Sequence, residues 1–354
     1  MQILVKKSTA AFMLIAMANL VVAFIAFFIL PPKFFYDAAI IVYDKGNEIG
    51  FIGSYPLTIL FYKITGLKYL PFPVIGLLQF PVLMYVLYKI GIPDNFEKLN
   101  VKNCLVYLGI FMIAIFISMP SKEFITYLLV SSIVFIFINK RVSFQKSIIC
   151  SVSILFVFGV LYRPYFVLIP IIGFGMYCVS FISFKNKTLT TIFYGLLITI
   201  FLSLAYGFIK GEHFSEITRE VVNNTRIGVG DSNSSITPPL KPDTWYGEIV
   251  AIFYGFFTVN IPVNGLKHIF SPQIILFVVW QLLLFYILLV RFSKCLKERK
   301  KYRYEFSILL ILFSFFIVQG VFEPDLGSAV RHKIGIFPLI YFALYYEHFR
   351  KELQ

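Results

Sequence analysis

The stretch Ala10–Leu30 reads AAFMLIAMANLVVAFIAFFIL, and none of its 21 residues is charged. At 1.5 Å per residue, a helix of this length crosses the ~30 Å hydrocarbon core of a bilayer. Its end, Leu30-Pro31-Pro32, lacks the small-x-small pattern at which a signal peptide is cut, so we expect a retained first span. The stretch therefore predicts a helix in lipid, and the pattern recurs along the chain.

The composition extends this interpretation to the whole chain. Of 354 residues, 59% are hydrophobic and 14% charged, and the mean hydropathy is +0.83. A soluble domain of this size cannot bury so much apolar surface, so we expect one integral membrane domain, residues 1–354. Its apolar runs predict ten spans: Ala10–Leu30, Leu70–Ile90, Cys104–Met119, Phe124–Ile138, Ser147–Leu161, Tyr165–Ile182, Thr188–Ile209, Pro272–Leu289, Phe306–Phe322 and Ile334–Tyr346.

Charge orients these spans. With Met1 on the cytoplasmic side, the inside segments hold 19 of the 32 basic residues but only 6 of the 18 acidic ones. This is the positive-inside pattern of an inner-membrane protein, and it predicts that both termini are cytoplasmic. The net charge of +14 therefore requires no nucleic-acid partner. The four cysteines fall near the cytoplasmic ends of spans, where thiols stay reduced: Cys104, Cys150, Cys178 and Cys295.

Two connections on the opposite, periplasmic side are long. Residues 31–69 include a half-length apolar stretch, Ile49–Tyr62, which is too short to cross and predicts a re-entrant or interfacial helix. Residues 210–271 begin with an amphipathic stretch and contain a second interfacial segment, Trp245–Val263. The expected fold is thus an all-α polytopic membrane protein with about ten transmembrane helices. Its two long periplasmic loops carry re-entrant or amphipathic helices.

The short periplasmic connections are unexpectedly polar. They are Pro120–Glu123, Tyr162–Tyr165 and Glu323–Lys333. A hinge between two spans needs only turn-forming residues, whereas charges at the membrane boundary are costly unless they are paired or used. These connections are therefore the first candidates for a functional site.

Arg163 stands between two tyrosines at the end of a predicted span. A guanidinium there suits bidentate binding of a phosphate, although an Arg extending to the interface fits equally well. Ser121 predicts an N-cap, and Glu123 in the next turn is favoured by the helix dipole whatever its function. Lys122 opposes that dipole, and beside the free amides of a helix start it suits an anionic ligand.

Arg331, His332 and Lys333 form the densest basic patch on this side. Pairing with the nearby acids Glu323 and Asp325 is the alternative to ligand binding. His332 has a reference pKa of ~6.5, which suits a general base. No second His or Cys stands at ligand spacing, so no zinc site is predicted.

The long loops add further candidates. Arg219 and Arg226 are basic, although Arg219 also fits the polar side of an amphipathic helix. Trp245 and Tyr246 either stack on sugars or anchor the interface. The triplet Asn223-Asn224-Thr225 matches a glycosylation sequon, but nothing else predicts a eukaryotic secretory route. The sequence contains no nucleotide-binding motif, Ser-His-Asp order or Cys cluster.

Pro120-Ser121-Lys122-Glu123, Tyr162-Arg163-Pro164 and Arg331-His332-Lys333…Pro338, with a long loop before the last spans, resemble Wzy-type O-antigen and capsule polymerases and the related EpsG-like proteins. The resemblance covers the whole chain in topology. It implies a GT-C-like inverting glycosyltransferase of lipopolysaccharide biosynthesis, acting at the periplasmic face of the bacterial inner membrane. Such enzymes move a glycan from undecaprenyl pyrophosphate to the terminal sugar of another lipid-linked repeat unit.

The resemblance also implies roles for the candidate residues. Pyrophosphate would be bound by Arg163, Arg331, Lys122, Arg219, Lys333 and Arg226. The base would be His332, Glu123 or Asp37, in falling order. Sugars would contact Tyr162, Tyr165, Trp245 and Tyr246.

No cofactor or metal is implied, because pyrophosphate is the leaving group. Expected partners are undecaprenyl-pyrophosphate-linked repeat units, with a chain-length regulator and a flippase of the same pathway. Three alternatives remain open: an O-antigen ligase, a transferase using a polyprenyl-phosphate sugar, and a flippase of lipid-linked oligosaccharide. A flippase would need charges inside its spans, and these spans are nearly free of charge.

Overall fold

The computed structural model describes residues 6–43, 50–182, 184–225 and 234–351. All regular structure in these ranges is helical, in agreement with the predicted all-α class. The chain, which we expected to form one domain, groups into two compact units. Unit 1 comprises residues 1–163 and 331–354, and unit 2 comprises residues 164–330.

Unit 1 contains most of the helices of the first half of the chain and the C-terminal ones. Helix α14 (Leu326–Gly335) contains the second boundary between the units. The other elements of unit 1 are α1 (Lys7–Ile29), η1 (Pro32–Phe35), α2 (Tyr36–Tyr43), α3 (Ser54–Ile64), η2 (Leu67–Tyr69), α4 (Phe72–Ile90), α5 (Val101–Phe116), α6 (Lys122–Ile138), α7 (Phe144–Leu161), α15 (Phe337–Leu344) and α16 (Tyr346–Lys351).

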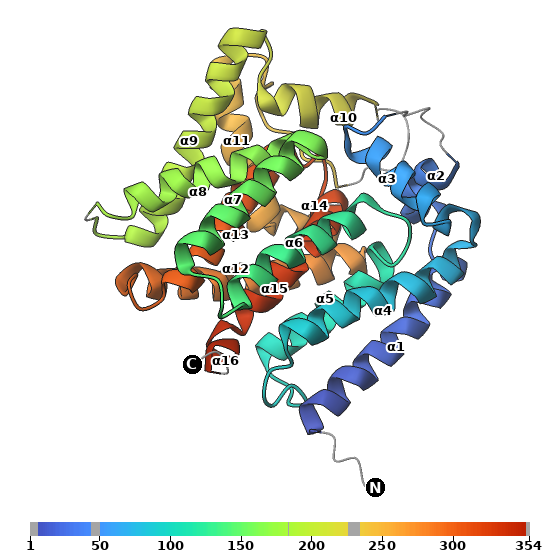
Figure 1. The fold of residues 1–354 in the computed structure, drawn as a ribbon. Helices are drawn as coiled ribbons and strands as arrows, with labels where there is room; N and C mark the ends of the chain where they lie inside the picture. The colour runs from blue at the N-terminus through green and yellow to red at the C-terminus, as the bar shows by residue number, and fades with distance from the viewer. Residues whose placement is uncertain (1–5, 44–49, 183, 226–233, 352–354) are drawn as a thin grey trace, which may run out of the picture. The chain divides into compact units, whose positions relative to one another are not determined.

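Close helix contacts define the packing of unit 1 (Figure 1). Helix α1 lies along α4 and α5, and α6 packs against α7, α4 and α15. Gly76 lets α4 approach α1, because a Cβ at this position would stand 3.1 Å from the carbonyl oxygen of Ala23. Gly109 of α5 similarly makes room for the ring of Phe337 in α15. These small residues at helix crossings are typical of helices packed in membranes.

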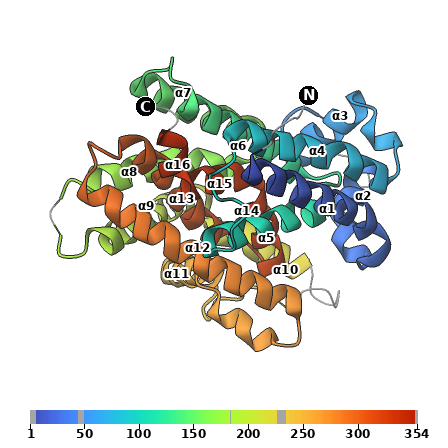
Figure 2. The ribbon, with the colours of Figure 1, turned by 90° about the horizontal axis from the view of Figure 1, so that it is seen from below.

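Unit 2 is built around one helix, α13 (Arg303–Phe322). In this helix, 89% of an 18-residue apolar stretch is buried. It contacts α8 (Leu168–Val179), α9 (Lys187–Lys210), α11 (Trp245–Asn260) and α12 (Pro272–Lys297) (Figure 2). The backbones of α11 and α13 meet at Gly255 and Gly320, where a side chain on either residue would collide with the other helix. The short elements of unit 2 are η3 (Pro164–Val167), the π-helical turn η4 (Glu216–Glu220), α10 (Val221–Thr225) and η5 (Val263–His268).

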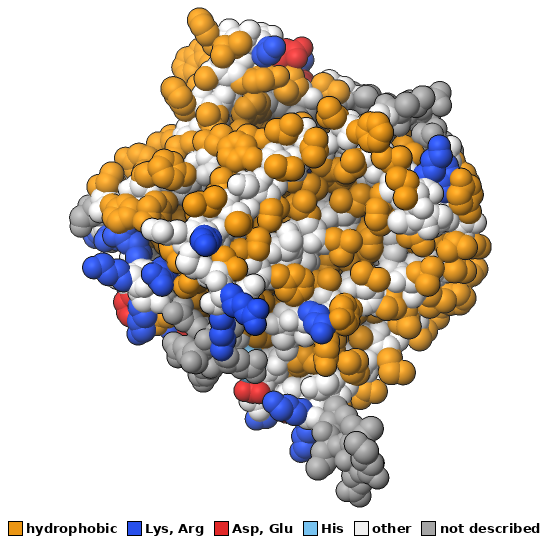
Figure 3. All heavy atoms as spheres, viewed as in Figure 1, with side chains coloured by type: hydrophobic (Ala, Val, Ile, Leu, Met, Phe, Trp, Pro, Cys, Tyr) orange, Lys and Arg blue, Asp and Glu red, His pale blue; other side chains and the backbone are white. Residues whose placement is uncertain are grey.

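Six described helices are long and apolar enough to cross a membrane. Hydrophobic side chains cover most of the surface visible in Figure 3. On α1, for example, Leu14 and Phe28 are 67% and 66% exposed. Exposed apolar surface of this extent marks contact with lipid or with another protein. The six are α1, α4, α7, α9, α13 and α12, the last counted from Ile274.

The remaining predicted spans take other forms. Cys104–Met119 and Tyr165–Ile182 correspond to shorter apolar helices, Val101–Phe116 and Pro164–Val179, and Phe124–Ile138 to the 17-residue α6. The tenth predicted span, Ile334–Tyr346, is not one helix, because it is divided among α14, α15 and α16. Pro338 lies in the first turn of α15, where its missing N–H breaks the run.

The expected interfacial segment Trp245–Val263 is mostly the single helix α11. It packs on α9 and α13 within unit 2 and buries one whole side, including Ala251, Gly255 and Val259. A helix that only rested on a membrane surface would not need glycine at a helix crossing. The segment is therefore part of the packed unit.

Candidate functional site

Charged side chains from four separate stretches of the chain meet in unit 1. They come from the first turn of α2, the start of α6, the second residue after α7, and α14. We call them the polar cluster: Asp37, Lys122, Glu123, Arg163, Arg331 and His332.

Glu123 is the centre of one half of the polar cluster. Its Oε1 accepts a hydrogen bond of 2.6 Å from Arg163 Nη2 and lies 3.2 Å from His332 Nε2. The Glu123 side chain is fully buried, so these partners replace water in stabilising its charge. Its Oε2 is also buried and meets no hydrogen-bond donor among the described residues. Such an oxygen is a binding point for a water or a ligand hydroxyl.

Asp37 is the centre of the other half. Its Oδ2 accepts a 2.5 Å hydrogen bond from Arg331 Nη1, and its Oδ1 accepts a 3.0 Å bond from the Tyr55 hydroxyl. Burial raises the pKa of Asp37, but the charges of Lys122 and Arg331 outweigh burial and hold that pKa below its usual value. Burial, with Asp37 alongside, raises the pKa of Tyr55, so this phenol remains a neutral donor.

The two halves differ in exposure. In the Asp37–Arg331 pair, 21% of the Asp37 side chain and 22% of the Arg331 side chain are exposed, whereas the Glu123 side chain is not exposed at all. His332 is similarly accessible, at 24%. A ligand can therefore reach Asp37, Arg331 and His332 without unfolding the unit.

Lys122 connects the two halves. Its Nζ stands 3.7 Å from the centre of the Tyr55 ring, a cation–π contact. Asp37 and Glu123 both attract it electrostatically. Within the polar cluster, three basic side chains face two carboxylates, so an anion would restore the balance of charge.

The start of α6 is held in place by buried phenols. The predicted N-cap is confirmed, because Ser121 Oγ accepts the backbone N–H of Phe124 at 3.2 Å. The Tyr62 hydroxyl accepts the N–H of Ser121 at 3.2 Å, and the Tyr162 hydroxyl donates to the carbonyl of Lys122 at 3.0 Å. The backbone that carries Lys122 and Glu123 is therefore fixed on three sides.

Two predicted residues of unit 1 lie outside the polar cluster. Tyr162, expected to contact sugar, is 1% exposed, and its hydroxyl also shares a 2.6 Å hydrogen bond with Thr58. Its ring therefore presents no face to a sugar in this structure, and its contacts are those of a residue that positions α6. Lys333 is fully buried in α14.

Four of the five predicted residues in unit 2 lie in its described part. Arg219 is 1% exposed, and each of its three side-chain nitrogens donates to a backbone carbonyl, from Ala251, Gly320, Val321 and Glu323. Burial lowers the pKa of Arg219 to about 10, against the effect of Glu248 and Glu323, so it is still charged at neutral pH. This arginine binds the loop to α11 and α13, and its contacts are those of a structural anchor.

The aromatic candidates of unit 2 differ in their surroundings. Tyr165 stacks on Phe322, with ring centres 5.2 Å apart. Trp245 and Tyr246 begin α11 and are 64% and 50% exposed, so both can bind a sugar or a lipid headgroup. Arg226 lies outside the described residues.

Sequence analysis missed the residues that support the polar cluster. Tyr55, Thr58 and Tyr62 lie on α3, inside the half-length apolar stretch, and Gln79 of α4 hydrogen-bonds the Tyr62 hydroxyl at 2.5 Å. The spacing of three and four residues places these three polar groups on one face of a helix. A purely apolar interfacial helix does not need these polar groups, so the pattern could have been recognised in the sequence.

The polar cluster has the chemistry of an anion-binding site with a carboxylate or imidazole available to accept a proton. Among the described residues, no three His, Cys, Asp or Glu side chains are grouped so as to hold a metal ion. No family model matches this chain, and neither the curated proteins nor the solved structures contain one that is significantly similar to it.

Proposed function

We propose that this protein is a polysaccharide polymerase of the bacterial inner membrane, with its active face in the periplasm. It would transfer a glycan from undecaprenyl pyrophosphate to the terminal sugar hydroxyl of another lipid-linked repeat unit, with inversion at the anomeric carbon. The observation that carries the proposal is the polar cluster. It combines three cations with accessible proton acceptors, and five of its six residues, all except Asp37, come from the polar connections that led to the family resemblance.

The reaction exchanges one bond at the anomeric carbon. The bond to the pyrophosphate oxygen breaks, a bond to the acceptor oxygen forms, and the acceptor proton passes to a base. Negative charge then develops on the pyrophosphate leaving group. Arg331 and Lys122, with Arg163 behind Glu123, are the groups proposed to stabilise it.

The geometry changes the order of preference for the base. Glu123 is buried and already contacts Arg163 and His332, so we assign it the role of positioning these two side chains. His332 and Asp37 remain as candidates because both are partly exposed. Asp37 is ionised at neutral pH but weakly basic, since its pKa is lowered, and this keeps His332 first.

A double substitution tests the anion-binding role. In purified protein supplied with lipid-linked oligosaccharide, we expect Arg163→Ala with Arg331→Ala to reduce transfer by at least about 100-fold, since charge stabilisation is typically the largest single contribution to catalysis. Lys63→Ala, at an exposed position of α3, is the control and should retain activity. Full retention of polymer length in the double variant would refute the role.

Gene deletion tests the reaction class. Gel analysis of surface polysaccharide should show a band with one attached repeat and no ladder if the protein is a polymerase. Loss of every attached repeat would instead indicate a ligase or a flippase.

A transferase that uses a polyprenyl monophosphate sugar is the second candidate. The place of Asp37 in the polar cluster favours it, because a first-loop acid is the residue on which that reaction would depend. Supplying the two donor types separately to purified protein distinguishes the reactions. Turnover of the monophosphate donor alone would replace the polymerase proposal with this one.

A further inference from the structure

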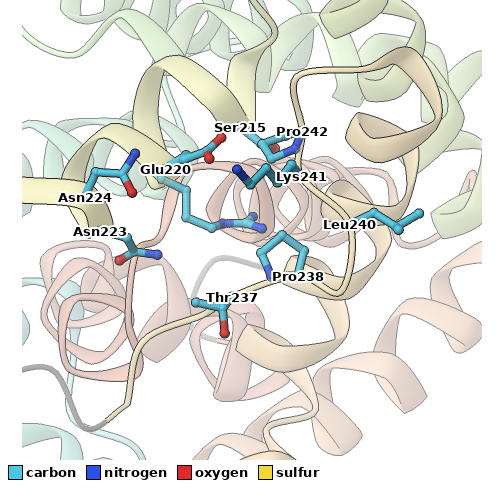
Figure 4. A pocket seen from close by; sticks show the side chains of 10 residues that line it. Ser215, Glu220, Asn223, Asn224, Thr237, Pro238, Leu240, Lys241 and Pro242 are labelled. Atoms are coloured by element: carbon cyan, nitrogen blue, oxygen red, sulfur yellow. The ribbon is translucent and has the colours of Figure 1, made fainter. Parts of the chain in front are cut away.

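Unit 2 contains a small pocket that the proposed reaction does not use. Its volume is about 160 Å³. One wall is the helical stretch from Ser215 to Asn224, and the other is the segment from Thr237 to Pro242 (Figure 4). Both walls belong to the long loop between α9 and α12.

The two walls are joined to each other and to the rest of unit 2. Asn223 Nδ2 donates to the carbonyl of Ile236 at 3.2 Å, which links one wall to the other. Ile236 is in turn bonded to the residue Pro324, because the Ile236 N–H donates to the carbonyl of Pro324 at 2.8 Å. Arg219, which also lines the pocket, fixes the first wall through its bonds to α11 and α13. The pocket is therefore a preformed feature of the loop.

The lining offers both hydrogen-bond acceptors and donors. Glu220 contributes a carboxylate, Asn224 an amide and Lys241 an ammonium group. Asn223 Oδ1 is buried and has no hydrogen-bond donor among the described residues, so it is an acceptor ready for a ligand. Figure 4 shows Glu220, Asn223 and Asn224 side by side on one wall.

Apolar surface completes the opposite wall. Pro238, Leu240 and Pro242 border the space there. A pyranose ring needs this combination, because its hydroxyl groups both donate and accept hydrogen bonds while its C–H faces are apolar. The volume is about half of the ~300 Å³ at which pockets for drug-sized ligands begin, so it admits one ring and not a chain of them.

An anion fits this pocket less well than a neutral sugar. The side chain of Arg219 is directed to backbone carbonyls, and the carboxylate of Glu220 repels negative charge. The other cation of the lining, Lys241, is exposed to solvent. A ligand with several hydroxyl groups satisfies both the carboxylate and the Asn223 carbonyl oxygen.

We propose that this pocket is a binding site for a single monosaccharide unit. The sugar hydroxyls donate to Glu220 and Asn223 and accept from Asn224 and Lys241, and one ring face lies against Pro238 and Leu240. The site requires no transfer reaction, so it stands apart from the proposed polymerase activity.

Saturation-transfer NMR on the full-length protein in detergent tests this site. The probes are methyl glycosides of glucose, galactose, mannose, N-acetylglucosamine and N-acetylgalactosamine, each added at millimolar concentration. We expect at least one glycoside to receive saturation from the wild-type protein. Glu220→Gln and Asn223→Ala should each weaken its apparent affinity by at least about fivefold, because each removes one hydrogen-bond acceptor.

Matched controls come from exposed positions of the same loop. Glu212→Gln and Asn264→Ala change the same residue types outside the lining and should leave glycoside binding unchanged. The melting temperature of every variant in detergent identifies any loss that is due to unfolding. If a pocket variant melts early, Lys241→Ala, at an exposed position of the lining, provides the same test without a buried contact.

Two results would overturn the site. Either no glycoside receives saturation from the folded wild-type protein, or the pocket variants and the controls bind equally well. Transfer activity is measured on the same preparations. Absence of transfer by the folded wild-type protein, together with glycoside binding that the pocket variants weaken, would count against the polymerase proposal and leave the sugar site standing.

Discussion

Glu123 and Asp37 carry the same charge in different surroundings. Glu123 is closed off between Arg163 and His332, while Asp37 and Arg331 are partly open to solvent. A buried charge is stable only while its partners remain. Glu123 therefore contributes mainly to the stability of the polar cluster, and Asp37 is available for contact with a ligand.

Substituting the buried carboxylate should be costly. We expect Glu123→Gln to lower the stability of the protein by about 3–5 kcal/mol, because it leaves the buried Arg163 charge without its anionic partner. Unfolding in detergent, followed by circular dichroism, measures the loss. The surface substitution Glu97→Gln is the control, and equal stability of the two variants would show that the Glu123 pair is not needed.

Asp37 should make stability depend on acid pH. Its folded-state pKa lies below the usual 3.8, so the unfolded chain binds a proton more readily than the folded protein does. The stabilisation is therefore fully present above about pH 5 and is lost as the pH falls below 3.8 towards the lowered value. Melting temperatures between pH 6 and pH 3 should fall more steeply for the wild type than for Asp37→Asn. Parallel curves would contradict this assignment.

At the scale of elements, the start of α6 decides where two of the six cluster residues lie. The Ser121 cap, the Tyr62 hydroxyl and the Tyr162 hydroxyl fix that start. The half-length helix α3 has a function in this arrangement that hydropathy does not suggest. It supplies Tyr55 to Asp37 and Lys122, and Tyr62 to the start of α6.

Two N-caps provide a matched test of this idea. Ser121 caps α6 beside the polar cluster, and Ser143 caps α7 in the same way, with its hydroxyl accepting the N–H of Lys146. Each Ser→Ala change should cost about 1 kcal/mol of stability. Only Ser121→Ala should also reduce transfer activity, by about tenfold, because it loosens Lys122 and Glu123. Equal activity of the two variants would show that the position of the α6 start is unimportant.

At the scale of the whole molecule, six described helices that are long and apolar enough to cross a bilayer support a membrane protein. The orientation remains a prediction. Green fluorescent protein fused after Gln354 should fluoresce, because that terminus is expected in the cytoplasm. Alkaline phosphatase inserted at Asp243 should be active in the periplasm. The opposite pair of signals would invert the topology and move the polar cluster away from a periplasmic reaction.

Composition and periodicity were sufficient for the helical class, for most helix positions and for the Ser121 cap, since these depend on residues close together in the chain. They failed at Ile334–Tyr346, where Pro338 interrupts an apolar run that hydropathy alone would join. At Trp245–Val263 they did not indicate that Gly255 meets Gly320 across a helix crossing. Packing between segments that are distant in the chain decides such cases, and a local sequence pattern carries no information about that packing.

The sequence by itself determined which charges stand at the ends of the helices, because charged residues cannot lie cheaply among apolar ones in a span. Only the tertiary structure decided which of them meet. Glu123 pairs with Arg163 and His332, and Asp37 pairs with Arg331, 294 positions away in the chain. Arg219, equally basic in the sequence, is instead turned towards backbone carbonyls of α11 and α13. Charge selects the candidates, and the folded chain determines whether a candidate faces a ligand or its own backbone.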